Sequence, residues 1–222
     1  MNADAANSRV ALLAGATGLI GRALLPLLLS SAQHREVHVL VRRPLVGVAL
    51  HPKMHLRTVD FTRLPTLAAI DDVFIALGTT IKVAGSEAAF RQVDFDFVVN
   101  TARAARAAGA TRIAVVSAHG ADNASRVFYN RVKGDMQAAI AALGFESVAF
   151  AQPSLLMGDR AALGQPARAG EVWATRLLGP VMGWVPKSIR PIQAHDVAAA
   201  MLGAVAEARP GVRILSSGAM QP

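Results

Sequence analysis

A tyrosine and a lysine four residues apart give this sequence its clearest chemical signal. Tyr129 is the only tyrosine among the 222 residues, and Lys133 follows it in Tyr129-Asn-Arg-Val-Lys133. On a helix this spacing places both side chains on one face, one turn apart. A phenol ionises at about pH 10 in water, and a nearby ammonium lowers that value by stabilising the phenolate. The pair therefore predicts proton transfer to or from a substrate oxygen.

Ser117 completes a candidate catalytic set. It ends the valine-rich run Arg112–Ser117, ahead of the tyrosine in the chain. A carbonyl that accepts hydride develops negative charge on its oxygen, which then needs a proton and a hydrogen-bond donor. We predict Tyr129 as the proton donor, Lys133 as the group that tunes it, and Ser117 as the group that orients the substrate. The alternative is a helix with a half-buried tyrosine and a surface lysine.

A glycine turn near the start of the chain predicts a site for a dinucleotide. Gly15-Ala-Thr-Gly18-Leu-Ile-Gly21 follows the apolar run Val10–Ala14 and opens a helical stretch. Gly15 allows a sharp turn, Gly18 lets phosphates approach the backbone, and Gly21 lets the helix pack close to the strand. The free N–H groups and the positive end of that helix would then face the pyrophosphate.

The residues at the end of the second expected strand indicate which dinucleotide binds. An acidic residue there would bind the free 2′-hydroxyl of NAD, but this chain has Arg42 and Arg43. Guanidinium groups suit a 2′-phosphate, so NADP(H) is preferred over NAD(H). The alternative is a pair of solvated arginines. After the third strand, Asp60 could accept from the adenine amino group while Phe61 packs near the ring.

Two further strand ends complete the expected cofactor path. Small residues in Leu77-Gly78-Thr79 would let the cofactor pass close to the sheet edge. After the sixth strand, the chain would turn beneath the nicotinamide at Pro153, and backbone groups from Ser154 to Leu156 would meet its carboxamide.

Strands and helices alternate along the chain, which predicts an α/β fold with a doubly wound, Rossmann-like parallel sheet flanked by helices. We expect one NAD(P)-binding domain over residues 1–222, with a small C-terminal insertion, residues 155–191, forming the substrate side. Residues 1–8 are expected to be a disordered start. The expected strands are Val10–Ala14, Val37–Val41, His55–Val59, Asp72–Leu77, Arg112–Ser117, Ser147–Ala151 and Val212–Leu215. The expected helices are Gly21–Ser31, Ser86–Ala108 with a break near its start, Ser125–Leu143 and His195–Ala208.

Composition narrows the classes of function. Without cysteine, the chain has no disulfides, thiolate catalysis or zinc–thiolate sites, and no pair of histidines has metal-ligand spacing. The net charge of +8 comes from scattered arginines without interleaved aromatic residues, so we expect no nucleic-acid partner. No run approaches the roughly 20 apolar residues that cross a bilayer, so we expect no membrane partner and a cytoplasmic protein.

The chain resembles the atypical short-chain dehydrogenase/reductase superfamily, and most closely the Tat-interacting-protein oxidoreductases and their bacterial NAD(P)H-binding relatives. The resemblance runs from Val10 to about Ala208. It is carried by Gly15-Ala-Thr-Gly18-Leu-Ile-Gly21, Leu40-Val-Arg42-Arg43, Ala76-Leu-Gly-Thr-Thr80, Val93-Asp94, Val115-Val-Ser-Ala-His-Gly-Ala-Asp122, Phe128-Tyr-Asn-Arg-Val-Lys-Gly134 and Arg190-Pro-Ile-Gln-Ala-His-Asp-Val197.

The resemblance implies a Rossmann fold that binds NADPH and a Ser-Tyr-Lys site at Ser117, Tyr129 and Lys133. Carried over by position, the pyrophosphate site would consist of Gly15, Thr17, Gly18, Leu19, Ile20 and Gly21. The remaining cofactor contacts would come from Arg42, Arg43, Asp60, Phe61, Leu77, Gly78, Thr79, Pro153, Ser154, Leu155 and Leu156.

The predicted function is reduction of a small carbonyl or enone compound by NADPH. Two alternatives stay open: a non-catalytic NADPH-binding redox sensor, and an enzyme like the sugar-nucleotide epimerases or dehydratases. Only about seventy residues follow the sixth strand, which argues against a sugar-nucleotide substrate. The substrate and the roles of His119 and Asn100 stay open, as does a homodimer through the helices expected at Ser86–Ala108 and Ser125–Leu143.

Overall fold

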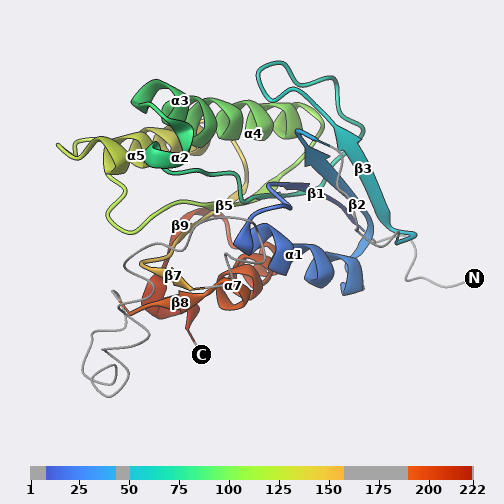
Figure 1. Ribbon diagram of the computed structural model, residues 1–222. Helices are drawn as coiled ribbons and strands as arrows, with labels where there is room; N and C mark the ends of the chain where they lie inside the picture. The colour runs from blue at the N-terminus through green and yellow to red at the C-terminus, as the bar shows by residue number, and fades with distance from the viewer. Residues whose placement is uncertain (1–8, 44–50, 158–189, 222) are drawn as a thin grey trace, which may run out of the picture.

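A seven-stranded parallel sheet forms the centre of the molecule (Figure 1). In this computed structural model, residues 9–43, 51–157 and 190–221 are described. The strand order is β3-β2-β1-β4-β5-β6-β9, which confirms the predicted doubly wound, Rossmann-like fold. The strands are β1 (Arg9–Ala14), β2 (His34–Val41), β3 (Met54–Thr58), β4 (Asp72–Ile75), β5 (Arg112–Val116), β6 (Ser147–Gln152) and β9 (Gly211–Ser216).

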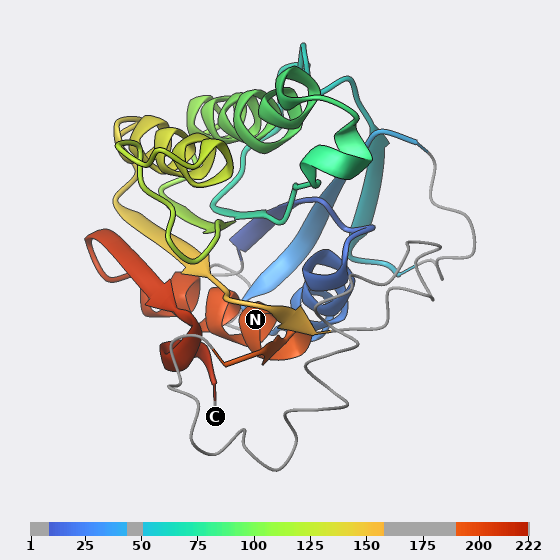
Figure 2. The ribbon, with the colours of Figure 1, turned by 60° about the vertical axis from the view of Figure 1, so that its left-hand side comes forward.

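Helices cover both faces of the sheet. Figures 1 and 2 show α1 (Leu19–Ser30) and α7 (Ala194–Glu207) together on one face. The opposite face carries α4 (Phe97–Ala107) and α5 (Phe128–Ala141), with α3 (Glu87–Arg91) before them. The central strands are buried on both sides, and their sequences are accordingly mostly apolar.

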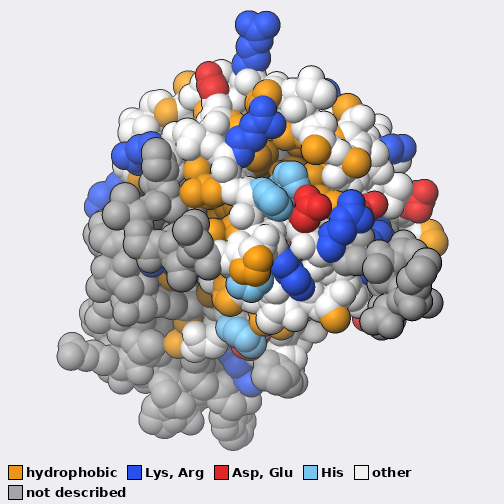
Figure 3. Space-filling model, turned by 90° about the vertical axis from the view of Figure 1, so that its right-hand side faces the viewer, with side chains coloured by type: hydrophobic (Ala, Val, Ile, Leu, Met, Phe, Trp, Pro, Cys, Tyr) orange, Lys and Arg blue, Asp and Glu red, His pale blue; other side chains and the backbone are white. Residues whose placement is uncertain are grey.

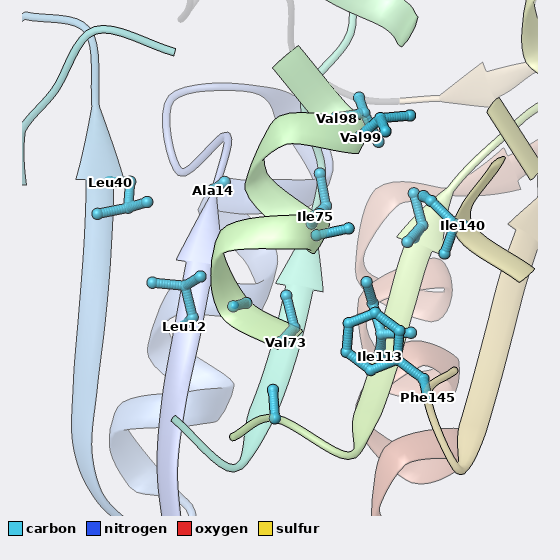
Figure 4. Packing of buried hydrophobic residues seen from close by; sticks show 14 of the residues in the cluster. Leu12, Ala14, Leu40, Val73, Ile75, Val98, Val99, Ile113, Ile140 and Phe145 are labelled. Atoms are coloured by element: carbon cyan, nitrogen blue, oxygen red, sulfur yellow. The ribbon is translucent and has the colours of Figure 1, made fainter. Parts of the chain in front are cut away.

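Alternate residues of the five inner strands, β2, β1, β4, β5 and β6, enter two separate cores. In β1, Leu12 and Ala14 belong to the core beneath α4 and α5, whereas Ala11 and Leu13 belong to the core over α1 and α7. Figure 4 shows the first of these cores, in which residues of β1, β4 and β5 meet Val98 and Val99 of α4. The two cores fix the sheet between its helical layers, so the ends of its strands are rigid positions for functional groups.

The chain reverses its direction of winding between β1 and β4. From β1 the sheet grows outward through β2 and β3, and from β4 it grows the other way through β5, β6 and β9. The loops that leave the carboxyl ends of β1 and β4 therefore diverge and leave a crevice between them. Ligands of open α/β sheets bind at such a switch point.

The helix predicted over Ser86–Ala108 was expected to break near its start, but α3 and α4 follow one another without a break and are joined by a feature that was not predicted. Between α3 and α4 lies the π-helical turn η2 (Gln92–Asp96). Such a turn contains more residues than an α-helical turn and changes which side chains face inward. Its buried side chain is Asp94. Apolar periodicity alone does not locate such a turn, because it is a single insertion into a helical pattern.

Four short elements were not predicted, because two to four residues carry no readable periodicity. They are α2 (Ile81–Ala84), β7 (Leu156–Met157), β8 (Ile192–Gln193) and the 3-10 helix η5 (Ser217–Met220). β7 and β8 pair in parallel and bring the two ends of the predicted substrate-side segment together. Residues 158–189 of that segment, and the expected disordered start at 1–8, lie outside the described residues.

Candidate active site

A cleft of about 690 Å³ opens at the carboxyl edge of the sheet, at the switch point. Its walls come from the loops after β1, β4, β5 and β6, from α2 and η2, and from the first turns of α5. The lining residues are Gly18, Leu19, Ile20, Ala76, Leu77, Gly78, Thr79, Thr80, Lys82, Val83, Asp94, Val116, Ser117, Ala118, His119, Tyr129, Lys133, Pro153, Ser154 and Leu156. The cleft therefore brings together residues predicted for cofactor binding and all three predicted for catalysis.

The glycine turn packs so closely against neighbouring backbone that two of its positions have no room for a side chain. Gly15 has φ +95°, and a Cβ there would lie 2.4 Å from the carbonyl oxygen of Ala76. A Cβ on Gly21 would lie 2.0 Å from the carbonyl oxygen of Gly15. Gly21 thus lets α1 pack on the turn itself, whereas the sequence predicted contact with the strand. At Gly18 the nearest atom to a Cβ would be 3.6 Å away, an ordinary van der Waals contact, so this position is less tightly enclosed than the other two.

The N-terminus of α1 has the properties of an anion site. Gly18 is its N-cap, and within the described residues no side chain caps the helix or places a carboxylate in its first turn. Leu19 and Ile20, in that turn, line the cleft. Uncapped N–H groups at a helix start carry partial positive charge and bind phosphate. Together with the glycine surface, this cradle fits the pyrophosphate of a dinucleotide.

The residues predicted for the adenosine end lie outside the cleft lining. Arg42 and Arg43 follow β2 and are both exposed, at the carboxyl edge of the sheet. Asp60 is exposed after β3, and one of its oxygens accepts the Thr62 N–H at 2.8 Å. That backbone hydrogen bond lowers the pKa of Asp60 below its usual value.

Phe61 requires a correction. Its side chain is 1% exposed and stacks on Phe97 of α4, with ring centroids 5.8 Å apart. The sequence predicted that this ring would pack near adenine, but the loop after β3 turns it into the core beneath α4. Only its backbone groups are left for a nucleotide, and the carbonyl already accepts from the Asn100 amide at 3.2 Å. Asn100 is thus part of the support for this loop.

The predicted Tyr129 and Lys133 lie one turn apart on α5, and Lys133 is buried. The Lys133 Nζ is 2.7 Å from Oδ1 of Asp94, which is also buried. Burial disfavours the ammonium, but the attraction of Asp94 and Tyr129 outweighs it, so the pKa of Lys133 is raised. The ring of Tyr129 packs against the fully buried Phe90 of α3, with centroids 5.4 Å apart.

Asp94 is the functional candidate that the prediction of site residues missed. Its Oδ1 holds Lys133, and its Oδ2 accepts the Thr79 N–H at 2.8 Å. It therefore joins α5 to the loop after β4 across the floor of the cleft. The sequence offers one signal. Asp94 lies between the apolar residues Val93 and Phe95, which is unusual for a solvent-exposed carboxylate, and a buried lysine needs a counterion of this kind.

Ser117 lies directly after β5 and is also buried. Its hydroxyl oxygen accepts a hydrogen bond from the Gln137 amide at 2.6 Å. Gln137 is one turn beyond Lys133 on α5, so the helix presents Tyr129, Lys133 and Gln137 in a row. Since Gln137 donates, the hydroxyl proton of Ser117 can be directed elsewhere.

The loop after β6 forms the remaining wall. Pro153, Ser154 and Leu156 line the cleft, but Leu155 does not. The Leu155 carbonyl accepts from the Ile192 N–H at 2.9 Å, and the Ser154 hydroxyl donates to the Arg190 carbonyl at 2.6 Å. These bonds connect the wall to β8 and fix the loop that was predicted to lie near the nicotinamide.

Outside the cleft, charges of both signs are mixed. Figure 3 shows histidine, acidic and basic side chains together on the face that carries the β3 edge of the sheet. There Glu36 of β2 accepts from His38 at 3.2 Å and lies 3.8 Å from His55 of β3. Among the described residues, no group of three potential ligands is arranged to hold a metal ion, and no helix is long and apolar enough to cross a membrane.

Comparisons with known proteins agree with this geometry. A family model described as NAD(P)H-binding matches residues 15–147. "Protein fmp52, mitochondrial" of Emericella nidulans is 32% identical over 79% of this chain and 81% of its own length. "Protein HTATIP2" of Rattus norvegicus is 32% identical over 74% of this chain and 68% of its own. The fold resembles that of the Bordetella bronchiseptica enzyme WbmF solved with NAD+, with a TM-score of 0.68, 15% identity, and coverage of 95% of this chain and 74% of WbmF.

The relatives also correct the predicted location. The matched FMP52 proteins of Emericella nidulans, Aspergillus fumigatus and Eremothecium gossypii are each named mitochondrial, so by this comparison the prediction of a cytoplasmic protein is wrong. That prediction was inferred from the lack of an apolar run long enough to cross a bilayer and from an N-terminal region not read as a targeting segment. Neither observation distinguishes between compartments.

Proposed function

Because this chain belongs to the atypical short-chain dehydrogenase-like family of NAD(P)H-binding proteins, we propose that it is an NADPH-dependent reductase of a small carbonyl or enone compound. One observation carries the proposal. A single cleft is lined both by Gly18 and the uncapped start of α1 and by Tyr129, Lys133 and Asp94, the last two forming a buried ion pair. This is an anion cradle within reach of a proton donor.

The pyrophosphate, ribose and nicotinamide of the cofactor would be held by residues from three strand ends. The turn from Gly15 to Gly21, including Thr17, would hold the pyrophosphate through backbone N–H groups. Leu77, Gly78 and Thr79 would line the path of the ribose, and the residues from Pro153 to Leu156 would meet the nicotinamide. When bound, NADPH supplies the hydride for the carbonyl or enone carbon.

Tyr129 supplies the proton in this proposal. As the substrate carbon accepts hydride, its oxygen takes the phenolic proton, so a carbonyl becomes an alcohol. The resulting phenolate lies beside the Lys133 ammonium, which Asp94 holds at 2.7 Å. A proton from solvent then restores the phenol. The packing of Tyr129 on Phe90 keeps the ring in one orientation for this transfer.

Ser117 would bind the same substrate oxygen. Because Gln137 donates to its oxygen at 2.6 Å, the serine hydroxyl is available as a donor. A donor fixed in place before the reaction stabilises the negative charge that develops on the carbonyl oxygen.

The preference for NADP(H) is part of the proposal and depends on Arg42 and Arg43. Both are exposed at the carboxyl edge of the sheet, where a 2′-phosphate would meet them. Replacing both by alanine should weaken NADPH binding about tenfold or more while NADH binding changes little, because only the phosphate contacts are lost. Fluorescence titration with each cofactor measures this. Equal weakening of both would contradict a 2′-phosphate site.

The catalytic part is tested by NADPH oxidation over a panel of ketones, aldehydes and enones. Tyr129→Phe should lower kcat/KM by about a hundredfold or more, because the ring still packs but has no proton to give. Its dissociation constant for NADPH should stay within about twofold of wild type. Undiminished turnover by this variant would refute the mechanism.

A non-catalytic NADPH sensor is the second candidate. It is favoured by the fact that Lys133 and Ser117 are already bound to protein partners, Asp94 and Gln137. Tight NADPH binding without consumption of any compound in the panel would support this alternative over the reductase.

A further inference from the structure

The carboxylate of Asp94 makes more contacts than its ion pair with Lys133 alone. Its carboxylate is about 1% exposed, one oxygen contacts the Lys133 ammonium at 2.7 Å, and the other accepts the Thr79 N–H at 2.8 Å. A Cβ added to Gly78 would lie 3.3 Å from Oδ1, so the loop after β4 encloses the carboxylate closely. Neither the carboxylate nor the ammonium can turn away to solvent.

The charge of Asp94 changes what Lys133 does to its neighbour. A free ammonium beside Tyr129 would draw the phenolic proton off at a lower pH. An anion fixed next to that ammonium turns the cation into a dipole, whose effect at the phenol is much weaker. Both groups are buried, so water and salt screen this cancellation little.

We propose that Asp94 is a positioning residue that holds the Tyr129–Lys133 pair in its fully protonated form, ready to donate a proton. The inference rests on the proposed reductase function and goes beyond it. With the ammonium neutralised, Tyr129 keeps its proton over a wider pH range. A site built in this way favours reduction, in which the tyrosine acts as an acid, over oxidation, in which it acts as a base.

The other charged groups around Tyr129 are less able to play this part. His119 and Lys82 line the same cleft but are exposed, so solvent screens them. On the neighbouring helices, Arg91 of α3 and Asp135 of α5 neutralise each other at 2.9 Å and are partly exposed. Among the described residues that line the cleft, Asp94 is the one buried carboxylate.

The raised pKa of Lys133 shows that the ammonium beside Asp94 is favoured despite its burial. Burial alone would favour loss of its proton, but the fields of Asp94 and Tyr129 overcome that effect. If Asp94 became neutral, Lys133 could keep its charge by taking the Tyr129 phenolate as its new counterion. The pair would then lose its first proton from the phenol, at a lower pH than in the wild type.

The composition of the chain makes this measurable without a substrate. Tyr129 is the only tyrosine, so the near-ultraviolet absorbance of phenolate reports this one side chain, with Tyr129→Phe as the blank. In Asp94→Asn, the pH at which Tyr129 ionises should fall by about one unit or more, equivalent to a tenfold change in its proton affinity. An unchanged or higher value would overturn the inference.

A double variant tests the same point should Asp94→Asn fail to fold. Asp94→Asn/Lys133→Met buries no charge and should therefore fold. If Asp94 cancels Lys133 in the wild type, Tyr129 should ionise within about half a unit of the wild-type pH in this variant. A value about one unit or more above wild type would mean that the ammonium acts uncancelled, and would overturn the inference.

The matched control is Asp72→Asn, because Asp72 is equally buried at the opposite edge of the sheet. It should leave the ionisation of Tyr129 unchanged. Where wild type turns over a carbonyl substrate, the alkaline limb of its kcat/KM profile should move to lower pH in Asp94→Asn, in step with the titration. Absence of turnover in the wild type would refute the reductase, whereas the absorbance titration would still decide the role of Asp94.

Discussion

Among the described residues, two carboxylates are buried, Asp72 at the start of β4 and Asp94 in the π-helical turn η2, and they are neutralised in different ways. At the amino edge, Asp72 begins β4 and binds His34 at 2.8 Å, with the guanidinium Nε atoms of Arg9 and Arg112 at 3.3 and 2.6 Å. At the carboxyl edge, Asp94 binds one ammonium and one backbone N–H. The first carboxylate joins the starts of four strands, while the second faces a cleft.

The difference shows how similar burial can serve stability in one place and chemistry in another. Arg9 and Arg112 are about one-fifth exposed, and arginine is a permanent cation in proteins. The Asp72 cluster therefore serves to connect the strands. Lys133 is enclosed, and its charge depends on its neighbours. Burial next to a charged partner is one way in which a protein adjusts the proton affinity of a functional group.

The largest effect should come from removing the amino-edge carboxylate. Asp72→Ala leaves two guanidiniums and an imidazole without their anion, and we expect a loss of about 3 kcal/mol in the free energy of unfolding. Urea unfolding measures the loss, and NADPH affinity of the folded protein serves as the control, which should not change. A loss below about 1 kcal/mol would show that Asp72 lacks the stabilising role that distinguishes it from Asp94.

Removing the carboxyl-edge cation should mainly affect turnover. Lys133→Met takes the ammonium from beside Tyr129 and should lower kcat/KM for carbonyl reduction about a hundredfold. It also leaves Asp94 without its cation, so stability should fall as well. Adding Asp94→Asn removes the unpaired anion as well, so stability and turnover should both recover in large part. A double variant as inactive as Lys133→Met would show that the ammonium acts on Tyr129 without being cancelled by Asp94.

Alkaline pH should separate the two sites. The pKa of Lys133 is raised in the folded state, so its contribution to stability is complete below the ordinary lysine value of about 10.4 and is lost as the pH rises through the higher folded value. The stability cost of Asp94→Asn should therefore shrink above about pH 10.4. The cost of Asp72→Asn should stay constant, since arginine does not titrate there. Urea midpoints across this range provide the comparison, and parallel behaviour of the two variants would contradict it.

The smallest effect is expected at an exposed carboxylate. Glu36 is partly exposed on β2, and its pKa is lowered mainly by the hydrogen bond from His38. Its contribution is present above its ordinary value of 4.5 and is lost as the pH falls through the lower folded value. Glu36→Gln should change the free energy of unfolding by less than about 0.5 kcal/mol at pH 7, as measured by urea unfolding. A larger loss would show that the exposure of a carboxylate does not indicate how much it contributes to the free energy of unfolding.

Much of the fold could be predicted from the sequence because its signals are local. Apolar runs ending in glycine or polar residues gave all seven strands of the main sheet, with boundaries within a few residues. The glycine turn and the Tyr129–Lys133 spacing were also readable, since each depends on neighbours in the chain. The positions of Arg42 and Arg43 followed from strand order in the same way.

The errors concern contacts between segments distant in the chain. Asp94 reaches Lys133 only because the π-helical turn directs it inward, and no local pattern encodes that turn. Phe61 was placed outside because a residue next to an exposed aspartate at a strand end gives no sign that its loop folds beneath α4. The hydrogen bond from Gln137 to Ser117 could not be predicted, because it depends on how the end of β5 lies against α5.

The π-helical turn at Gln92–Asp96 also has an evolutionary consequence. Removing a single residue from it would restore an ordinary helix and rotate the preceding segment by about 100° relative to α4. Asp94 would then face away from Lys133 although no side chain at the site had been replaced. In a lineage of such proteins, a one-codon deletion would therefore separate Asp94 from Lys133 and shift the pH range of proton transfer. Comparisons that score only substitutions would overlook it.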